Sequence, residues 1–303
     1  MSDLDGPVRK ALHDSRLELS LEFTRSPAGA KSGAVVFKDA TGAEIARVQL
    51  ESPEAMNVAL ARLVELGFRD LRAAVSSAVV SRPQVEVSVL VAGVDGYRKG
   101  WVAVELDPSG DVQVSTHSSF SEVLSSQARV IAVDIPIDPP GLGVRQADAG
   151  ARAFVGGSRA SSVFSTPPRE ALEARTFADA NEIARTITGK GISQQAFALA
   201  RKILEVHTLA EVDERVIEMH PEVSFRELAG EPVLESKHTA AGLGRRRELL
   251  AATGIVLPGA VPGVPEADLL DAAAGAWTAA RYAGARARPF PPDHRERLGA
   301  IWR

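Results

Sequence analysis

Hydrophobic and polar residues form two successive series of patterns along the chain, and the series meet near residue 84. In the first series the patterns predict three strands, one helix and a further strand, at residues 16–23, 33–50 (two strands around a DATG turn), 52–67 and 69–77. The helix begins at a Ser-Pro capping signal and ends at a glycine. We therefore expect a small α/β domain over residues 1–84.

The second series repeats this order over residues 85–137 and then continues with further helices. It predicts three strands, a short helix and a strand, at residues 85–95, 101–106, 112–117, 119–126 and 128–137. A polar, arginine-bearing insertion around 145–210 contains a helix at 193–206, and a strand at 215–220 and a final helix at 266–285 follow. The repeated order indicates either an internal duplication or a coincidence of four elements. We assign the whole chain to the α/β class, with a second domain over residues 85–303.

Four aspartates lie where such a fold would bring them together. Asp95 and Asp134 each end an apolar strand, so paired strands would place both carboxylates at the carboxyl edge of one sheet. Asp268 and Asp271 share one face of the final helix, and the AAAGA run after them lets that helix lie close to the sheet. Four such carboxylates suit a pair of Mg²⁺ or Mn²⁺ ions about 4 Å apart, which is a site for phosphoryl-transfer hydrolysis.

Some of these aspartates also have a structural explanation. Asp95 lies between glycines, where aspartate commonly forms a turn, and Asp268 could favour a helix N-terminus through the helix dipole. Asp134 is different, because it lies between the apolar segments VIAV and IPI and an unpaired carboxylate is costly to bury there.

Composition narrows the classes of function. The chain has 303 residues with 45% hydrophobic and 24% charged residues, which is enough for one large or two ordinary cores. It has no cysteine, so disulfides, thiolate metal sites and cysteine nucleophiles are excluded, and any metal must bind oxygen or imidazole. The net charge of −4 argues against broad, nonspecific nucleic-acid binding. No apolar run approaches roughly 18 residues and no secretory signal is evident, so we expect a cytoplasmic protein that does not enter membranes.

Several motifs in the same order resemble an uncharacterised prokaryotic family of predicted nucleases with a ribonuclease H-like fold. They are GVDGYRKGWVAV, AVDIPI, RASSVFSTPPREAL, GKGISQQAFAL, IEMHPEVSF, SKHTAAGLGRRRELL and DLLDAAAGAWTAAR, and they span about residues 91–284. The resemblance implies a mixed sheet flanked by helices. It also implies a catalytic and metal-binding role for four aspartates, which are Asp95, Asp134, Asp268 and Asp271. Glu218 is a further catalytic candidate. Tyr97, Lys99 and Ala267 depart from the pattern expected of that family.

The first domain resembles a bacterial-type ribonuclease H domain from LEFTRSPAG to LRAAVSS. Acids expected at the ends of its first and fourth strands are replaced by Thr24 and by Ser76 or Ser77, and a site without those carboxylates cannot hold two magnesium ions. We interpret residues 1–84 as a truncated, inactive ribonuclease H-like repeat. An unrelated small α/β domain is the alternative.

Two further segments could bind a phosphate backbone. GGSRASSVFSTP offers glycine backbone with Arg159, Ser161 and Ser162, although the same composition describes any polar loop. KHTAAGLGRRRELL offers Lys237 and the arginines that begin at Arg245, although it could equally be a solvated helix start. His220 is favoured as a structural residue over a general base or metal ligand.

These observations predict a divalent-metal-dependent nuclease that binds DNA or RNA only locally. Two other classes stay open. One is a noncatalytic scaffold on the same fold, which would not need convergent carboxylates, and a homodimer is compatible with it. The other is a nucleotide-binding phosphotransferase of the actin-like or sugar-kinase type, which would need a second glycine-rich phosphate loop that the sequence lacks.

Overall fold

The computed structural model describes residues 18–25, 31–38, 44–50, 87–294 and 296–303. The chain divides into two compact units between residues 82 and 83. In the first unit an antiparallel sheet has the order β1-β2-β3, formed by Glu18–Arg25, Lys31–Lys38 and Glu44–Leu50. The three expected strands are therefore confirmed, and Thr24 lies in β1. The helix expected at 52–67, the strand expected at 69–77 and Ser76 and Ser77 lie outside the described residues.

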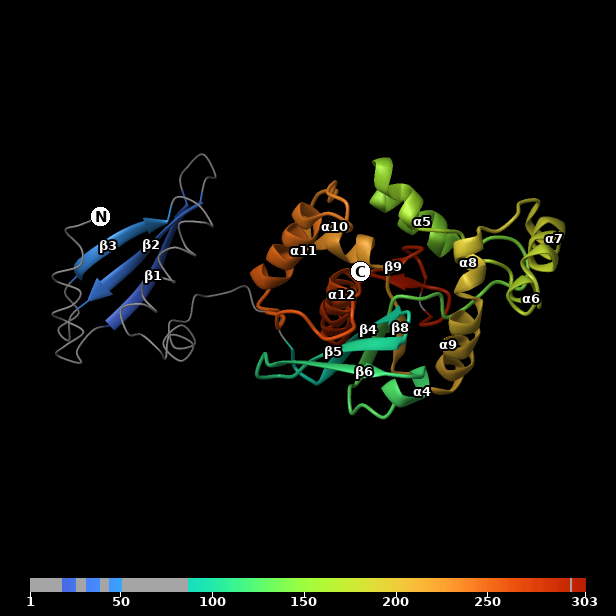
Figure 1. Ribbon diagram of the computed structural model, residues 1–303, viewed down its shortest axis with the longest axis horizontal. Coiled ribbons are helices and arrows are strands. Elements are labelled where there is room, and N and C mark those ends of the chain that lie inside the picture. The colour runs from blue at the N-terminus through green and yellow to red at the C-terminus, as the bar shows by residue number, and fades with distance from the viewer. Residues whose placement is uncertain (1–17, 26–30, 39–43, 51–86, 295) are drawn as a thin grey trace. The chain divides into compact units, whose positions relative to one another are not determined.

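The second unit is built on a mixed five-stranded sheet with the order β6-β5-β4-β7-β8 (Figure 1). Its strands are β4 (Val91–Tyr97), β5 (Gly100–Leu106), β6 (Val112–His117), β7 (Val130–Val133) and β8 (Val216–Glu218). Strands β4, β5 and β6 pair antiparallel, whereas β7 pairs parallel with both β4 and β8. Two short strands, β9 (Pro289–Phe290) and β10 (Ile301–Trp302), form a separate antiparallel pair.

Helices cover both faces of the sheet, because successive residues of β4 and β7 alternate between two apolar cores. Val91 and Val130 pack in the core that includes α12 (Glu266–Ala283), α10 (Pro221–Ala229) and α11 (Ala240–Ala252). Ala92 and Ile131 pack in the opposite core with α4 (Phe120–Val123) and α9 (Ala200–Val212). Figure 1 shows these two groups of helices on opposite sides of the strands.

The insertion expected around residues 145–210 folds largely into short helices. They are α5 (Gln146–Val155), the 3₁₀ helix η1 (Gly157–Ser162), α6 (Arg169–Leu172), α7 (Phe177–Thr188) and α8 (Gln194–Ala198). Hydroxyl side chains cap two of them, since Thr176 and Ser193 each accept a backbone N–H at the N-terminus of α7 and α8. No helix in the described part of the chain is long and apolar enough to cross a membrane.

Two elements differ from the sequence expectations. Strand β4 does not end at Asp95 but continues to Tyr97, because Tyr97 pairs with Gly100 and closes a tight hairpin with β5. The helix expected at 193–206 is two helices, α8 and α9, separated by Leu199. The Leu199 N–H bonds the carbonyl of Ala196 three residues back instead of four, which interrupts the helical hydrogen-bond pattern there.

Helix α12 lies unusually close to β4. A Cβ atom placed on Gly93 would stand 1.9 Å from the backbone nitrogen of Ala276, and one on Gly275 would stand 3.0 Å from the Cα of Gly93. Backbone therefore packs on backbone at this point, which only glycine permits. The expectation that the AAAGA run allows a close approach is confirmed.

Candidate metal centre

Asp95 and Asp134 lie side by side because their strands are paired in parallel. Val94 of β4 is the register partner of Val133 of β7, and the residue after each of them is an aspartate. The Asp134 N–H donates to the Val94 carbonyl oxygen at 2.9 Å. Asp95 and Gly93 are two residues apart, so both point to the face of the sheet that α12 covers. Alternation along the strands thus directs these carboxylates toward α12.

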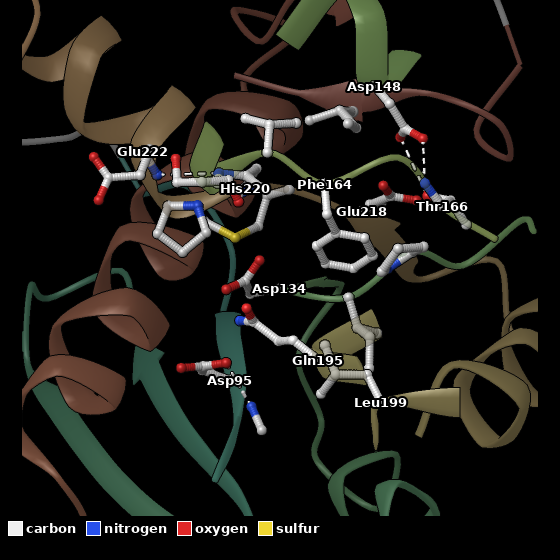
Figure 2. A pocket seen from close by; sticks show the side chains of 18 of the residues that line it. Asp95, Asp134, Asp148, Phe164, Thr166, Gln195, Leu199, Glu218, His220 and Glu222 are labelled. Atoms are coloured by element: carbon white, nitrogen blue, oxygen red, sulfur yellow. Dashed lines mark hydrogen bonds between the residues drawn. The ribbon is translucent and has the colours of Figure 1, made fainter. Parts of the chain in front are cut away.

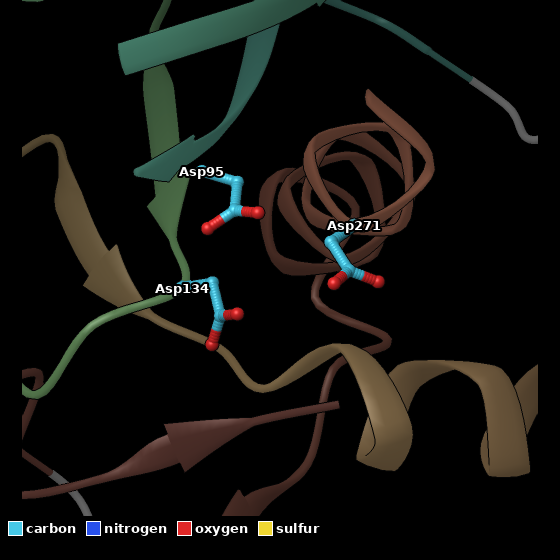
Figure 3. Close-up of side chains that lie close together, drawn as sticks. All are labelled: Asp95, Asp134 and Asp271. Atoms are coloured by element: carbon cyan, nitrogen blue, oxygen red, sulfur yellow. The ribbon is translucent and has the colours of Figure 1, made fainter. Parts of the chain in front are cut away.

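Asp271 completes the cluster from the facing helix, one turn before Gly275. One carboxylate oxygen from each of Asp95, Asp134 and Asp271 lies within 4.8 Å of the others, and Figure 3 shows the three side chains converging from β4, the end of β7 and α12. The Asp271 side chain is 1% exposed and its Oδ1 atom has no hydrogen-bond partner among the described residues. Its Oδ2 atom accepts from the Lys237 Nζ at 2.5 Å.

Burial raises the pKa of each carboxyl in the cluster, and repulsion from nearby carboxylates raises it further, from within the cluster for Asp95 and Asp134 and from Glu222 for Asp271. Burial is the largest cause for all three, and the charges of Asp134 and Asp271 raise the pKa of Asp95 further. The pKa of Asp134 rises to about 8, mainly through burial and the charge of Asp271. Lys237 responds in the opposite sense. Burial alone would lower its pKa, but attraction to Asp271 and Asp134 raises it overall.

This arrangement fits a hard divalent cation. Mg²⁺ and Mn²⁺ prefer carboxylate oxygens, and three such oxygens already lie close enough to share one ion. The buried, unpartnered Asp271 Oδ1 atom is a polar group that a cation would satisfy. A bound cation would also offset the repulsion that raises these pKa values.

The other two predicted acids lie outside this group of three. Asp268 lies one turn before Asp271 on α12 and lines a pocket together with Asp95 and Asp134. Burial raises its pKa, but its oxygens are not among those that lie within 4.8 Å of one another. Glu218, the last residue of β8, accepts from Arg145 at 2.7 Å and from the Ile137 N–H at 2.9 Å. Burial raises the pKa of Glu218 to about 7 even beside this arginine. The structure thus gives Glu218 a partner in a buried ion pair, and its catalytic role stays a prediction.

The predicted phosphate-binding residues are arranged differently from a phosphate loop. Arg159 contacts the Glu222 carboxylate at 3.4 Å and donates to the Glu235 carbonyl oxygen at 3.1 Å, and the Ser162 hydroxyl donates to the Arg159 carbonyl oxygen at 2.7 Å. Ser161 and Ser162 line the pocket near the acids. Arg245 lies on α11, 3.9 Å from Glu248, and is not among the residues that line the pocket.

The sequence did not indicate that a buried arginine, Arg246, lies near the cluster. Arg246 is fully buried, pairs with Glu222 at 2.7 Å and donates to the carbonyl oxygens of Glu235 and Gly242 at 3.0 and 3.2 Å. The Arg245–Arg247 run suggested a solvated surface, so nothing in the sequence marked its middle residue as buried. The available signal was the spacing of three, four and seven residues that groups Arg246 with Leu243, Leu249 and Leu250 on one side of α11.

Asp95, Asp134 and Asp268 line a pocket of about 380 Å³. Figure 2 shows Phe164 and Gln195 beside Asp134, with Asp95 below them. Lys202 also lines the pocket and donates to the carbonyl oxygens of Tyr97 and Gly100 at 3.0 and 2.5 Å. Burial lowers the pKa of this lysine. The insertion, which the sequence described only as polar, supplies several of the lining residues, among them Ser161, Phe164 and Gln195.

His220 has the structural role favoured by the sequence. It is the N-cap of α10, where its Nδ1 atom accepts the Glu222 N–H at 3.2 Å. The Nε2 atom must then carry the proton, and it lies 3.3 Å from the Ser162 carbonyl oxygen as a donor. Burial lowers the pKa of His220, which is consistent with a neutral ring.

The sheet, its covering helices and the buried carboxylates define an α/β protein with a candidate cation site on one sheet edge. The chain belongs to the family DUF429, a family of proteins of unknown function, whose model matches residues 93–296. No match was found among curated proteins or among solved structures. The family match covers all four aspartates named above.

Proposed function

We propose that the protein is a divalent-metal-dependent nuclease that hydrolyses phosphodiester bonds on a ribonuclease H-like fold. The observation that carries this proposal is the cluster of Asp95, Asp134 and Asp271, in which one oxygen of each residue lies within 4.8 Å of the others. Two of these residues, Asp95 and Asp134, line a pocket. The mixed sheet flanked by helices supports the proposed fold. Buried like charges destabilise a fold, so a scaffold would gain nothing from keeping three of them together.

In the proposed reaction Asp95, Asp134 and Asp271 hold Mg²⁺ or Mn²⁺. The ion, when bound, supplies positive charge for a phosphoryl oxygen and lowers the pKa of a coordinated water. Asp95 is kept in place by the Gly96 N–H, which donates to its Oδ1 atom at 2.6 Å. The chain's own part is therefore to keep three carboxylates oriented and largely shielded from water, so that little reorganisation is needed during hydrolysis.

The pocket bears on the form of the nucleic acid. A volume of about 380 Å³ suits a unit of nucleotide size better than a stacked duplex. Phe164 faces the acids from the pocket wall and could stack on a base, an interaction that contributes roughly 1–3 kcal/mol per base. We therefore propose that a single strand, a strand end or an extruded nucleotide reaches the carboxylates.

Asp134→Asn tests this proposal, because asparagine keeps the shape of the side chain and removes the charge that a cation needs. At a Mn²⁺ concentration 100-fold above its Kd, we expect a stabilisation of the wild type by about 2.7 kcal/mol. For a domain of this size that corresponds to a rise in Tm of roughly 5–10 °C. The variant should lose this rise together with cleavage of single-stranded DNA and RNA, measured in the same samples.

Asp293→Asn is the matched control, since Asp293 is exposed and does not line the pocket. It should keep both the Mn²⁺-dependent rise and the cleavage. If the wild type shows neither, the nuclease proposal is wrong. If the wild type gains stability from Mn²⁺ but cleaves no nucleic acid, the cation site stands and the proposed reaction does not.

A further inference from the structure

Lys237 lies inside the acidic cluster as a cation of the chain itself. Its Nζ atom is 2.5 Å from Asp271 Oδ2, and its side chain is 31% exposed although lysine usually extends into solvent. The charges of Asp134 and Asp95 also attract it. Lys237 is therefore close to all three proposed metal ligands.

The turn that carries Lys237 is held rigidly. The Thr239 N–H and hydroxyl both donate to the Ser236 carbonyl oxygen, at 3.0 and 2.8 Å, and a Cβ atom on Gly242 would stand 1.9 Å from that oxygen. On the other side, Arg159 and Arg246 both donate to the carbonyl oxygen of Glu235. Contacts on both sides of Lys237 thus keep the ammonium group at the carboxylates.

The charge balance leaves room for one divalent ion. Three ionised carboxylates and one ammonium group sum to −2, which a single Mg²⁺ or Mn²⁺ neutralises. The neighbouring charged residues add little to this net charge. Arg246 pairs with Glu222, and the pocket lining contains both Lys202 and Asp268, whose charges are opposite. A second divalent ion would leave an excess of +2 in a buried site, and uncompensated buried charge is costly.

The carboxylate oxygens that are open to a metal ion also favour a single bound ion. Lys237 occupies Asp271 Oδ2, and the Gly96 N–H occupies Asp95 Oδ1. Asp271 Oδ1 has no partner among the described residues and remains for a cation. Asp268, the other acid on this face of α12, lies outside the group of oxygens that approach one another.

We propose that this site takes one divalent ion and that the Lys237 ammonium group stands in the place of a second ion. The inference rests on the proposed cation site and replaces the pair of ions expected from the sequence. Lys237 is then a fixed positive charge beside Asp271 that can neutralise a phosphate oxygen but cannot coordinate water.

The test is a count of bound Mn²⁺ in the full-length chain, by titration calorimetry and by electron paramagnetic resonance of the free ion. We expect one equivalent in the wild type. Lys237→Met removes the ammonium group and frees Asp271 Oδ2, so this variant should bind two equivalents. Lys237→Arg keeps the charge and should bind one. Lys202→Met is the matched control, because it removes a pocket lysine that bonds backbone carbonyls rather than a carboxylate, and it should also bind one.

Two equivalents in the wild type would overturn the proposal, and so would one equivalent in a folded Lys237→Met protein. If Lys237→Met does not fold, as judged by circular dichroism, the counts for the wild type and Lys237→Arg decide, and two equivalents in either overturn it. No bound ion in the wild type overturns both this inference and the proposed metal site. One bound ion without cleavage of nucleic acid supports this inference and contradicts only the nuclease.

Discussion

Asp134 ends a buried strand with a carboxyl group whose pKa rises from its ordinary value of 3.8 to about 8. In the metal-free protein this group is largely protonated at neutral pH, so a cation must displace a proton to bind. Burial raises the pKa of Asp95 and of Asp271 as well, and the charge of Asp134 adds to the rise at Asp95. Cation affinity at this site should therefore be strongly dependent on pH.

The raised pKa values predict how stability changes with pH. A carboxyl whose pKa is higher in the folded state binds protons more tightly when folded, and this contribution is complete below its unfolded pKa. For Asp134 the contribution is lost as the pH rises from about 4 to about 8. We expect the free energy of unfolding of the metal-free protein, measured by urea denaturation, to fall across this range.

Asp134→Asn should reduce that slope, because asparagine does not titrate. Saturating Mn²⁺ should stabilise the wild type more at pH 8 than at pH 6, since fewer protons then compete for the carboxylates. A Mn²⁺ effect that is the same at both pH values would contradict binding through these groups.

At the level of single residues, the sequence identified the acids but not their counter-ion. Asp95 and Asp134 could be predicted because each follows a run of apolar residues whose strand period sets its face. Lys237 could not be placed, because its turn is held by Arg159 and Arg246, which both donate to the Glu235 carbonyl oxygen and both contact Glu222. Spacing along the chain carries no signal for such contacts.

Helix α12 and strand β4 meet at a pair of glycines, Gly93 and Gly275. Asp95 lies two residues beyond one glycine, and Asp271 lies one helical turn before the other. The backbone contact therefore sets the distance between two carboxylates that come from different parts of the chain. Only a small range of helix positions on the sheet brings them together.

Gly93→Ala should separate these two elements. The added Cβ would stand 1.9 Å from Ala276 N and 2.1 Å from Ala272 O, both backbone atoms that cannot turn aside. Overpacking of this kind costs about 1–3 kcal/mol or more, so we expect a lower midpoint in urea denaturation and weaker Mn²⁺ stabilisation.

Gly244→Ala is the control for this substitution. Gly244 lies within α11, where an added Cβ atom would have no neighbouring atom within 4 Å among the described residues, and alanine favours a helix by about 1 kcal/mol over glycine. This variant should be as stable as the wild type or more so. If Gly93→Ala is equally well tolerated, the contact between α12 and β4 does not set the site.

Among the elements, those with a clear period were predicted and the insertion was not. Strands β5 and β6 match the expected residues 101–106 and 112–117 almost completely, because β5 is a short apolar run bounded by turn residues and β6 begins with alternating apolar and polar residues. The insertion combines short helices with polar loops, and several of its helices are too short to show a helical period. Its packing over the pocket depends on long-range contacts such as the ion pair of Arg145 with Glu218.

At the scale of the whole molecule, the proposed site lies entirely within residues 83–303. The described apolar cores that hold β4, β7 and α12 also lie within that unit. The residues that line the pocket fall between Asp95 and Ile301. The interpretation of residues 1–84 as an inactive ribonuclease H-like repeat therefore stays a prediction, separate from the chemistry proposed for the second unit.

We expect a chain of residues 83–303 to fold by itself, because it forms a compact unit with apolar cores of its own. Its cooperative thermal transition should show the same Mn²⁺-dependent rise as the full-length chain. Circular dichroism with and without Mn²⁺ measures both properties. A shortened chain that folds but no longer responds to Mn²⁺ would show that residues 1–82 are needed for cation binding.

The cluster draws its acids from β4, from the end of β7 and from α12, and this has a consequence for the newly made chain. Asp271 is synthesised 176 residues after Asp95, which at 5–20 residues per second corresponds to roughly 10 to 35 seconds on the ribosome. During that interval the two strand aspartates have neither the helix that shields them nor the lysine that pairs with Asp271. A nascent chain that ends before α12 therefore lacks one of the three carboxylates, and the proposed cation site is complete only after Asp271 has been made.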